Sequence, residues 1–301
     1  MMISRHPSPG ISSVVQKYGS TQTLVRIVAG ILLVLVASVD GAERLTLVVC
    51  APGYPGSTVE AQPAMDGLVA AAAAAAGWST QELTGVYFET EAGGIEALSR
   101  PDAAFALVTL PFFLEHREAL KLKPCAQAVE IGRNATESWS LVAGVGALAS
   151  AADLNGWELR SLAGHSHRFI RGPVLGSWGE LPENLTITFS GAVLSSLRKA
   201  ARGEKVAVLL DAPQASALDR LPFADKLEMV HRSAPLPVSL LCSVDGRISE
   251  ERSTELVAAL RGLDARPEAA EALTGVRLER FAAVDSEALI RAETAFDGVV
   301  E

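Results

Sequence analysis

Strand-like apolar runs alternate with helix-like segments along most of this chain, and this alternation constrains the fold more than any other feature. Residues 45–50 form a continuous apolar run with β-branched side chains, which is typical of a strand buried on both faces. A helix is expected at 59–76, with Pro63 near its first turn. It closes with seven consecutive alanines and stops at Gly77, because glycine readily adopts a left-handed cap. The order strand, helix, strand predicts a mainly parallel sheet covered by helices.

The same alternation continues toward the C-terminus. Further strands are expected at 85–88, 103–110, 138–142, 158–162, 185–189, 206–210 and 238–243. Further helices are expected at 92–99, 112–121, 168–178, 191–202 and 249–263, the last capped by Ser249, with a tail that stays helical to about Phe296. The chain therefore divides into two α/β units of similar size.

No long Pro- or Ser-rich linker separates these two units. We therefore expect two lobes that exchange chain directly, with lobe 1 at 42–137 and 241–301 and lobe 2 at 138–240. The chain crosses between them near 133–140 and again near 236–243. Two such crossings predict a two-strand hinge.

The N-terminus has the three regions of a secretion signal. Arg26 precedes thirteen uncharged residues, 27–39, and small residues follow at Gly41 and Ala42. The apolar run is short for a membrane span. Cleavage fits after Gly41 or after Ser38, and an uncleaved anchor is the alternative. Residues 1–41 are thus a signal peptide or N-terminal tail, and we expect the remainder in the periplasm.

Charge and cysteine usage exclude several functions. The chain carries a formal net charge of −9, and residues 1–41 hold three basic residues and one acidic, so the remainder is more negative still. This argues against nucleic acid as a partner. Cys50, Cys125 and Cys242 have no metal spacing, so we expect buried free thiols, with one disulfide as the alternative. Hydrolase, nucleotide-loop and zinc-protease motifs are missing, so we expect no enzyme and no cofactor.

Four stretches carry a resemblance to a known family. They are the 45–50 strand with the loop that follows the signal, the segment 95–107, the segment Ser-Ala-Ala-Asp-Leu-Asn-Gly at 150–156, and the helix and strand at 192–211 that end in Asp211. Over residues 45–265 the chain resembles the phosphate, phosphite and phosphonate substrate-binding proteins of ABC transporters, a branch of the type 2 periplasmic binding proteins.

The resemblance implies a two-lobed α/β fold in which each lobe is a mainly parallel sheet flanked by helices. It also implies a monomer that captures a small anionic solute, of the phosphate or phosphonate class, and presents it to an ABC transporter permease. Two alternatives are a ligand-sensing periplasmic component of a signalling system and an enzyme on the same scaffold. The scattered cysteines count against the enzyme.

Candidate ligand-binding residues follow from the rule that open α/β sheets bind ligands beyond the carboxyl ends of their strands. The rule selects four loops, which contain Tyr54, Gly56, Ser57, Thr58, Thr109, His165, Ser166, His167, Arg168 and Asp211. The loop at 164–168 is the sharpest candidate, because a serine, two histidines and an arginine at a helix start offer positive potential and several donors to an oxyanion.

Each candidate also has a structural alternative. Residues 54–58 fit a turn and a helix cap, and Asp211 fits a helix cap. His165 and His167 could share a metal, but no carboxylate or third histidine is close in sequence. The family has a Ser/Thr-rich turn where this chain has 164–168 and only Ser166 matches, which leaves a different anion open. Trp139, Trp157 and Trp178 are expected to fill lobe cores rather than to stack on a ligand.

Overall fold

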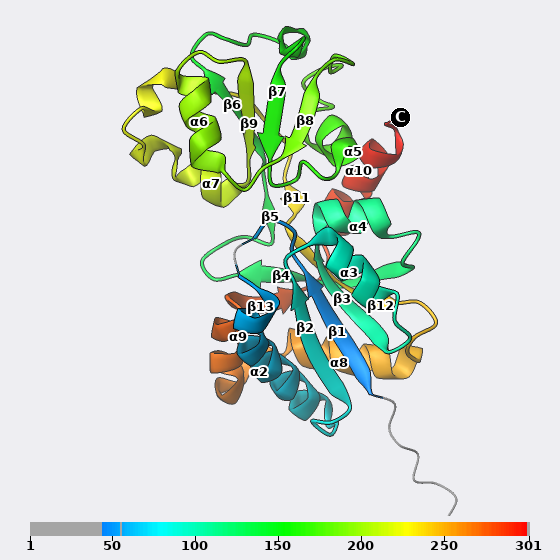
Figure 1. The fold of residues 1–301 in the computed structure, drawn as a ribbon. Helices are drawn as coiled ribbons and strands as arrows, with labels where there is room; N and C mark the ends of the chain where they lie inside the picture. Colours follow the sequence, from blue (N-terminus) through cyan, green and yellow to red (C-terminus); the bar gives the residue numbers. More distant parts are fainter. Residues whose placement is uncertain (1–43, 55, 300–301) are drawn as a thin grey trace, which may run out of the picture. The chain divides into compact units, whose positions relative to one another are not determined.

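A computed structural model describes residues 44–54 and 56–299 (Figure 1). The predicted signal peptide, its two cleavage sites and the alternative anchor lie outside the described residues. Within the described part, every helix is too short or too polar to cross a membrane.

The first sheet has six strands. Their order is β13 (Leu278–Ala282), β4 (Leu122–Glu130), β12 (Ser239–Val244), β3 (Ala103–Thr109), β1 (Leu45–Cys50) and β2 (Leu83–Phe88). β1 pairs in parallel with β2 and β3, whereas β12 is antiparallel to both β3 and β4, and β13 is antiparallel to β4. It follows that β1, β2, β3 and β4 all run in one direction, as expected for a mainly parallel sheet.

The helices beside this sheet are α2 (Thr58–Ala76), α3 (Glu91–Leu98), α4 (Leu110–His116), α8 (Glu250–Arg261) and α9 (Ala270–Gly275), with 3-10 turns at Leu263–Ala265 and Pro267–Ala269. The buried residues of α2 recur three and four apart from Met65 to Ala73, which places one face on the sheet. A capping box between Ser57 and Glu60 starts α2, and Gly77 ends it with φ 75°. Pro63 lies inside the helix and beyond the first turn. The sequence had predicted it near that turn.

The second sheet has five strands. Their order is β10 (Leu227–Arg232), β6 (Ser140–Gly144), β9 (Val206–Leu210), β7 (Glu158–Ser161) and β8 (Thr186–Phe189). β7 is parallel to β8 and β9, and β6 is antiparallel to β9 and β10. Its helical segments are α5 (His167–Phe169), a π-helical segment (Ile170–Val174), α6 (Val193–Ala201), α7 (Ala212–Ser216) and 3-10 turns at Ala151–Leu154, Leu218–Arg220 and Ala224–Lys226.

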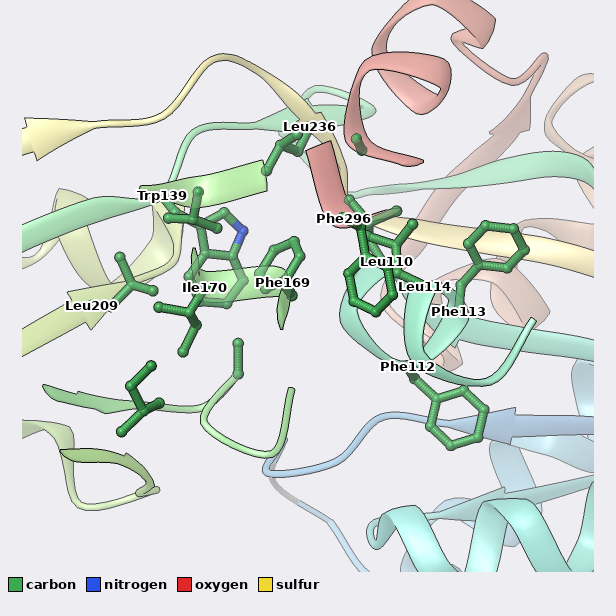
Figure 2. Packing of buried hydrophobic residues seen from close by; sticks show 14 of the residues in the cluster. Leu110, Phe112, Phe113, Leu114, Trp139, Phe169, Ile170, Leu209, Leu236 and Phe296 are labelled. Atoms are coloured by element: carbon green, nitrogen blue, oxygen red, sulfur yellow. The ribbon is translucent and has the colours of Figure 1, made fainter. Parts of the chain in front are cut away.

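The chain passes between the two sheets at two short strands. β5 (Thr136–Glu137) and β11 (Leu236–Pro237) pair antiparallel, with Leu236 opposite Glu137. A continuous hydrophobic cluster extends past these crossing strands and includes Phe112 beside the first sheet and Trp139 and Phe169 beside the second (Figure 2).

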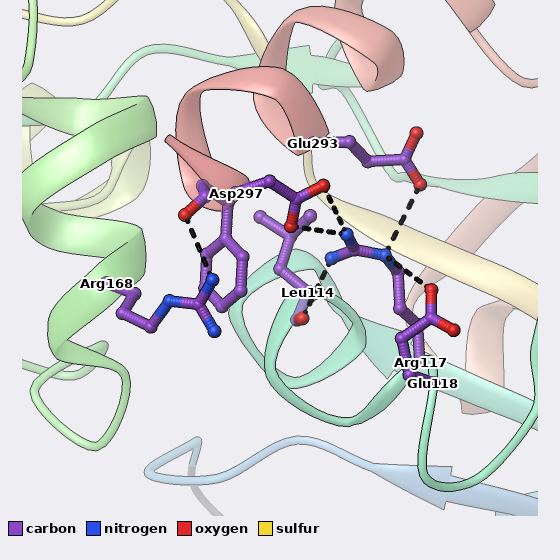
Figure 3. A network of polar contacts seen from close by, with 7 residues as sticks. Leu114, Arg117, Glu118, Arg168, Glu293 and Asp297 are labelled. Atoms are coloured by element: carbon purple, nitrogen blue, oxygen red, sulfur yellow. Dashed lines mark hydrogen bonds and ion pairs between the residues drawn. The ribbon is translucent and has the colours of Figure 1, made fainter. Parts of the chain in front are cut away.

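The C-terminal helix α10 (Ser286–Asp297) contacts elements of both sheets. It packs on the π-helical segment Ile170–Val174. Arg117, which follows α4, donates to both oxygens of Asp297 at 2.7 and 2.8 Å (Figure 3). α10 therefore links the two halves of the structure.

Several predicted elements differ from the structure. The tail is not helical throughout, because β13 interrupts it, and β4 and β10 were not predicted. The helix expected at 112–121 ends at His116. The helix expected at 168–178 is a single α-turn followed by π-helix, because Gly172, Pro173 and Gly176 disfavour regular α-helix there.

All three cysteines are free thiols. Cys50 and Cys242 are buried, as expected, and Cys125 is partly exposed. Burial raises the pKa of the Cys50 thiol to about 12, so this group stays protonated at neutral pH.

Candidate ligand-binding pocket

A small pocket lies where strand-end loops of both sheets meet the crossing strands. Its lining residues come from the loop after β1, the end of β3, the loop after β7 and the two crossing segments: Pro52, Tyr54, Thr109, Leu110, Pro111, Glu137, Trp139, Leu162, Ala163, His165, Pro237 and Val238. Its interior space of about 10 Å³ is room for roughly one water molecule. We call it the inner pocket.

Thr109 carries a buried polar group without a partner. The residue ends β3 in an extended conformation and stands at the N-cap of α4, but its side chain makes no capping hydrogen bond. It is 7% exposed, and Oγ1 has no hydrogen-bond partner among the described residues. Buried hydroxyls are normally paired with protein groups or with water, so this one is free to bond to a water molecule or to a bound solute.

His165 contributes a second unpaired atom from the other sheet. Its Nδ1 lies 3.2 Å from the carbonyl oxygen of Leu162, and Nε2 is buried without a partner in the described part of the chain. Burial lowers the pKa of His165, so the ring is neutral at pH 7. The inner pocket is thus lined by two residues with an unpaired buried atom, one from each half of the described structure.

Glu137 brings a carboxyl group to the same pocket from β5. Its Oε2 accepts a hydrogen bond from the backbone N–H of Ala212 at 3.1 Å. Burial, followed by the nearby charge of Asp211, raises the pKa of Glu137 to about 7. The carboxyl therefore changes charge near neutral pH.

Tyr54 connects this carboxyl group to its neighbours. The Tyr54 hydroxyl donates to Asp211 Oδ2 at a long 3.5 Å. Burial raises the pKa of Tyr54 well above its usual value, and the charges of Asp211, Glu137 and Glu130 raise it further. Burial also raises the pKa of Asp211. The charges of three carboxyl groups therefore act on one phenol.

A larger outer pocket adjoins the inner one and shares Tyr54, Glu137 and Val238 with it. Its volume is about 410 Å³. The remaining lining residues come from the segments on either side of the crossing and from α7: Glu130, Ile131, Gly132, Arg133, Asn134, Thr136, Ala212, Pro213 and Ser216. Arg133 pairs with Glu130 at 3.0 Å. The outer pocket has room for a small solute, and Glu137 lies at its boundary with the inner pocket.

The structure brings together three predicted site residues, Tyr54, Thr109 and His165, on the inner pocket. Asp211 lies beside them but acts as the N-cap of α7, where it accepts from the N–H of Gln214 at 2.8 Å. This is the structural alternative that the sequence left open for Asp211.

The rest of the first loop does not line either pocket. Ser57 forms the capping box of α2, and Thr58 donates to Glu89 at 3.1 Å. Gly56 is exposed, with φ 117°. The turn-and-cap interpretation of residues 56–58 agrees with these contacts.

The loop at 164–168 directs most of its polar groups away from the pockets. Ser166 is fully buried and donates to Glu115 of α4 at 2.7 Å. Arg168 lies over the Phe296 ring at 4.2 Å and donates to the Phe296 carbonyl oxygen at 3.3 Å, on the side of α10 (Figure 3). His167 is exposed. The metal alternative has no support, because the described residues hold no cluster of three or more metal-ligating side chains.

The tryptophans mainly fill the interior. Trp139 is 4% exposed and meets Phe169 edge-on at 5.5 Å, although one side of it also lines the inner pocket (Figure 2). Trp157 is buried, and Trp178 stacks on His231.

Sequence reasoning missed Glu137 as a pocket residue. Its strand, β5, is two residues long and has no periodic pattern. The one available signal was the predicted crossing near 133–140, because a chain segment that passes between two sheets must also pass the edge where their strands end.

Comparison with known proteins supports the fold. No protein-family model and no curated protein sequence matches this chain. Solved structures do match. XAC2383 from Xanthomonas citri, solved bound to ATP, superposes with a TM-score of 0.65 at 15% identity over 85% of this chain and 97% of that protein. The chain has the type 2 periplasmic-binding-protein fold.

The descriptions of two further solved structures with this fold mention a phosphonate, as a bound ligand in one and as the cargo of a transporter in the other. PhnD1 from Prochlorococcus marinus, solved with methylphosphonate, has a TM-score of 0.59 at 12% identity and covers 84% of this chain and 97% of its own. A binding component of an ABC phosphonate transporter from Pseudomonas aeruginosa has a TM-score of 0.57 at 13% identity, over 82% and 84%. At such low identity these matches establish the fold alone, and they confirm the α/β class predicted from the sequence.

Proposed function

We propose that this chain is an exported solute-binding protein that encloses a small solute between two lobes and delivers it to an ABC transporter permease. The observation that carries the proposal is the meeting of Thr109 and His165, each with an unpaired buried atom, in one pocket. A bound solute would supply the missing partners. The Pseudomonas neighbour is described as a binding protein component of a transporter, which supports binding rather than catalysis for this chain.

The proposal includes a closing motion. Lobe 1 comprises residues 42–137 and 241–301, lobe 2 comprises residues 138–240, and β5 and β11 act as the hinge. A solute held by Thr109 on one side and His165 on the other stabilises the closed form, because only that form makes both contacts. Helix α10, counted with lobe 1, packs on lobe 2 at Ile170–Val174 and would slide or detach during opening.

We also propose where the protein acts and which class of solute it binds. The protein acts in the periplasm as a monomer, without nucleic acid. A phosphate- or phosphonate-class solute is favoured by the descriptions of the Prochlorococcus and Pseudomonas neighbours. In this chain such an oxyanion would depend on the Thr109 hydroxyl, since Ser166 and Arg168 make other contacts and the Tyr54 hydroxyl donates to Asp211.

A thermal-shift screen of the purified protein tests the proposal. The panel contains phosphate, phosphite, methylphosphonate, sulfate, small carboxylates, polyols and amines. A solute at 100 times its Kd should stabilise the folded state by about 2.7 kcal/mol and raise Tm by several degrees. Thr109→Val, with affinity at least tenfold lower, should reduce that stabilisation to about 1.4 kcal/mol or less. Thr58→Val, which removes a hydroxyl bonded to Glu89 outside the pockets, should keep it.

Two results would contradict the proposal. One is the absence of any shift across the whole panel. The other is a shift of equal size in Thr109→Val and in the native protein, because the solute would then bind elsewhere.

A further inference from the structure

The unpaired groups of the inner pocket are mainly hydrogen-bond acceptors. A carbonyl oxygen only accepts, so the contact between His165 Nδ1 and the Leu162 carbonyl places the ring proton on Nδ1. Nε2 of the neutral ring then carries a lone pair, and no described residue donates to it. The Tyr54 hydroxyl gives its proton to Asp211, which leaves its oxygen as an acceptor.

The charges around the two pockets are predominantly negative. Glu137 lines both pockets, Glu130 lines the outer one, and Asp211, which lines neither, accepts from the Tyr54 hydroxyl. Arg133 and His165 are the basic side chains among the lining residues. Arg133 is already paired with Glu130 at 3.0 Å, and the His165 ring is neutral. An anion entering here meets carboxyl groups, and among the described lining residues it finds no unpaired cationic side chain.

The space favours a solute whose body lies in the outer pocket. The inner pocket has room for about one water molecule, whereas the outer pocket measures about 410 Å³. Glu137 lies at their boundary and so faces any solute that reaches inward. Thr109, 7% exposed and unpaired, adds a hydroxyl that both accepts and donates at the inner end.

We infer that the solute carries a protonated nitrogen, an ammonium or a similar group, with the Glu137 carboxylate as its counter-ion and the other acceptors of the inner pocket as its hydrogen-bond partners. This inference rests on the proposed solute-binding function and adds the charge class of the ligand. It departs from the simple oxyanion that the sequence predicts. A buried carboxylate that is paired with a cation and hydrogen-bonded is far less costly than an unpaired one, which gives Glu137 a role in this position.

Two sets of probes matched in size and differing in charge test the inference on the full chain. The first set is ethanolamine, ethylene glycol and glycolate, and the second is putrescine, 1,4-butanediol and succinate. The measurements are the thermal shift and the dissociation constant by calorimetry at pH 8. In at least one set the ammonium member should bind at least tenfold more tightly than its neutral and carboxylate counterparts.

Variants then assign the effect to Glu137. Glu137→Gln keeps the shape and removes the charge, and it should weaken ammonium binding at least tenfold. Glu89→Gln is the matched control, because Glu89 holds Thr58 outside both pockets, and it should leave binding unchanged. The Tm of each variant without ligand verifies that it folds.

Three results overturn the inference. The first is a neutral or carboxylate probe that binds as tightly as its ammonium counterpart in both sets. The second is ammonium binding that survives Glu137→Gln. The third is no ammonium binding at 10 mM. If phosphate or methylphosphonate binds in that third case, the proposed solute-binding function stands and only the charge class is wrong. If nothing in either panel binds, both are wrong.

Discussion

The loop at residues 164–168 has a stronger sequence signal for a binding site than the crossing strand β5, but it contributes less to the pockets. The loop has two histidines, a serine and an arginine, yet only His165 lines a pocket, while Ser166 and Arg168 contact Glu115 and Phe296. β5 has two residues and no pattern, yet its Glu137 lines both pockets. Residue type shows which chemical groups are present, but the direction of each side chain decides what they bind.

The loop predicted as the anion site instead contacts residues far away in the sequence. Arg168 has an aromatic ring and a carbonyl group to bind only because α10 returns 128 positions later in the chain to lie beside it (Figure 3). Similarly, Ser166 is buried because α4 of the other half supplies Glu115. The loop thus connects α4 and α10 to the second sheet, whereas Glu137 of the crossing strand lines the two pockets.

The largest effect is expected for Glu137→Gln, in the way its free energy of unfolding depends on pH. Below the ordinary carboxyl pKa of 4.5, Glu137 is neutral in both the folded and unfolded states and carries no penalty. Because its pKa in the folded protein is raised to about 7, the native protein loses stability as pH rises from 4.5 to 7. At pH 8 the glutamine variant should be more stable by about 3 kcal/mol, and at pH 4 the two should be equal. Urea unfolding at both pH values measures this. Equal stability at pH 8 would show that Glu137 is not a buried charge.

The next effect concerns the loop. Arg168→Ala removes the contact over the Phe296 ring and the hydrogen bond to its carbonyl group, so it should lower the free energy of unfolding by about 1 to 2 kcal/mol. Solute affinity should not change. Arg198→Ala, at an exposed position on α6, is the control and should stay within about 0.5 kcal/mol of the native protein. A loss of binding in Arg168→Ala at unchanged stability would restore the loop as the anion site.

A smaller loss is expected from Ser166→Ala. The variant leaves Glu115 without the hydroxyl at 2.7 Å and should cost about 1 kcal/mol of stability. Solute affinity should again be unchanged, since the hydroxyl does not line a pocket. Chemical denaturation and calorimetry on the same preparation separate the two quantities. A variant as stable as the native protein that no longer binds solute is the opposite result.

The smallest stability effect belongs to Thr109→Val, which has the same shape and removes the unpaired hydroxyl. Since that hydroxyl has no partner to lose, the stability should stay the same or rise by less than about 1 kcal/mol. Solute affinity should fall at least tenfold. Ser166→Ala and Thr109→Val therefore affect different quantities, stability in one and binding in the other. If both variants lose only stability, the distinction between loop and pocket is wrong.

The sequence predicted the central parts of the fold better than the edges. Strands β1 and β9 are apolar along their whole length and buried, so their pattern was clear. Only one residue of β10 is buried and two are charged, so β10 lacks the pattern of a central strand. β4 lacks it too, because it contains Pro124 and a bulge. β13 lies at the sheet edge, and a charged segment there was read as helix.

The strand-end rule found three of the twelve residues that line the inner pocket. Tyr54, Thr109 and His165 follow recognisable strands, and the rule places them at the same edge of their sheets. Glu137 and Pro237 belong to strands that exist only because β5 and β11 pair with each other. Such pairing is a tertiary contact between positions about 100 residues apart, and no local pattern encodes it.

The fluorescence of Trp139 tests most directly whether solute binds at this pocket. Trp139 lines the inner pocket, and a bound solute changes the surroundings of its ring. Addition of the solute that raises Tm most should change the emission of the native protein with the Kd found by calorimetry. The change should disappear in Trp139→Phe while the Tm shift remains. A full emission change in Trp139→Phe, or a Tm shift without any emission change in the native protein, would place the solute elsewhere and contradict the account.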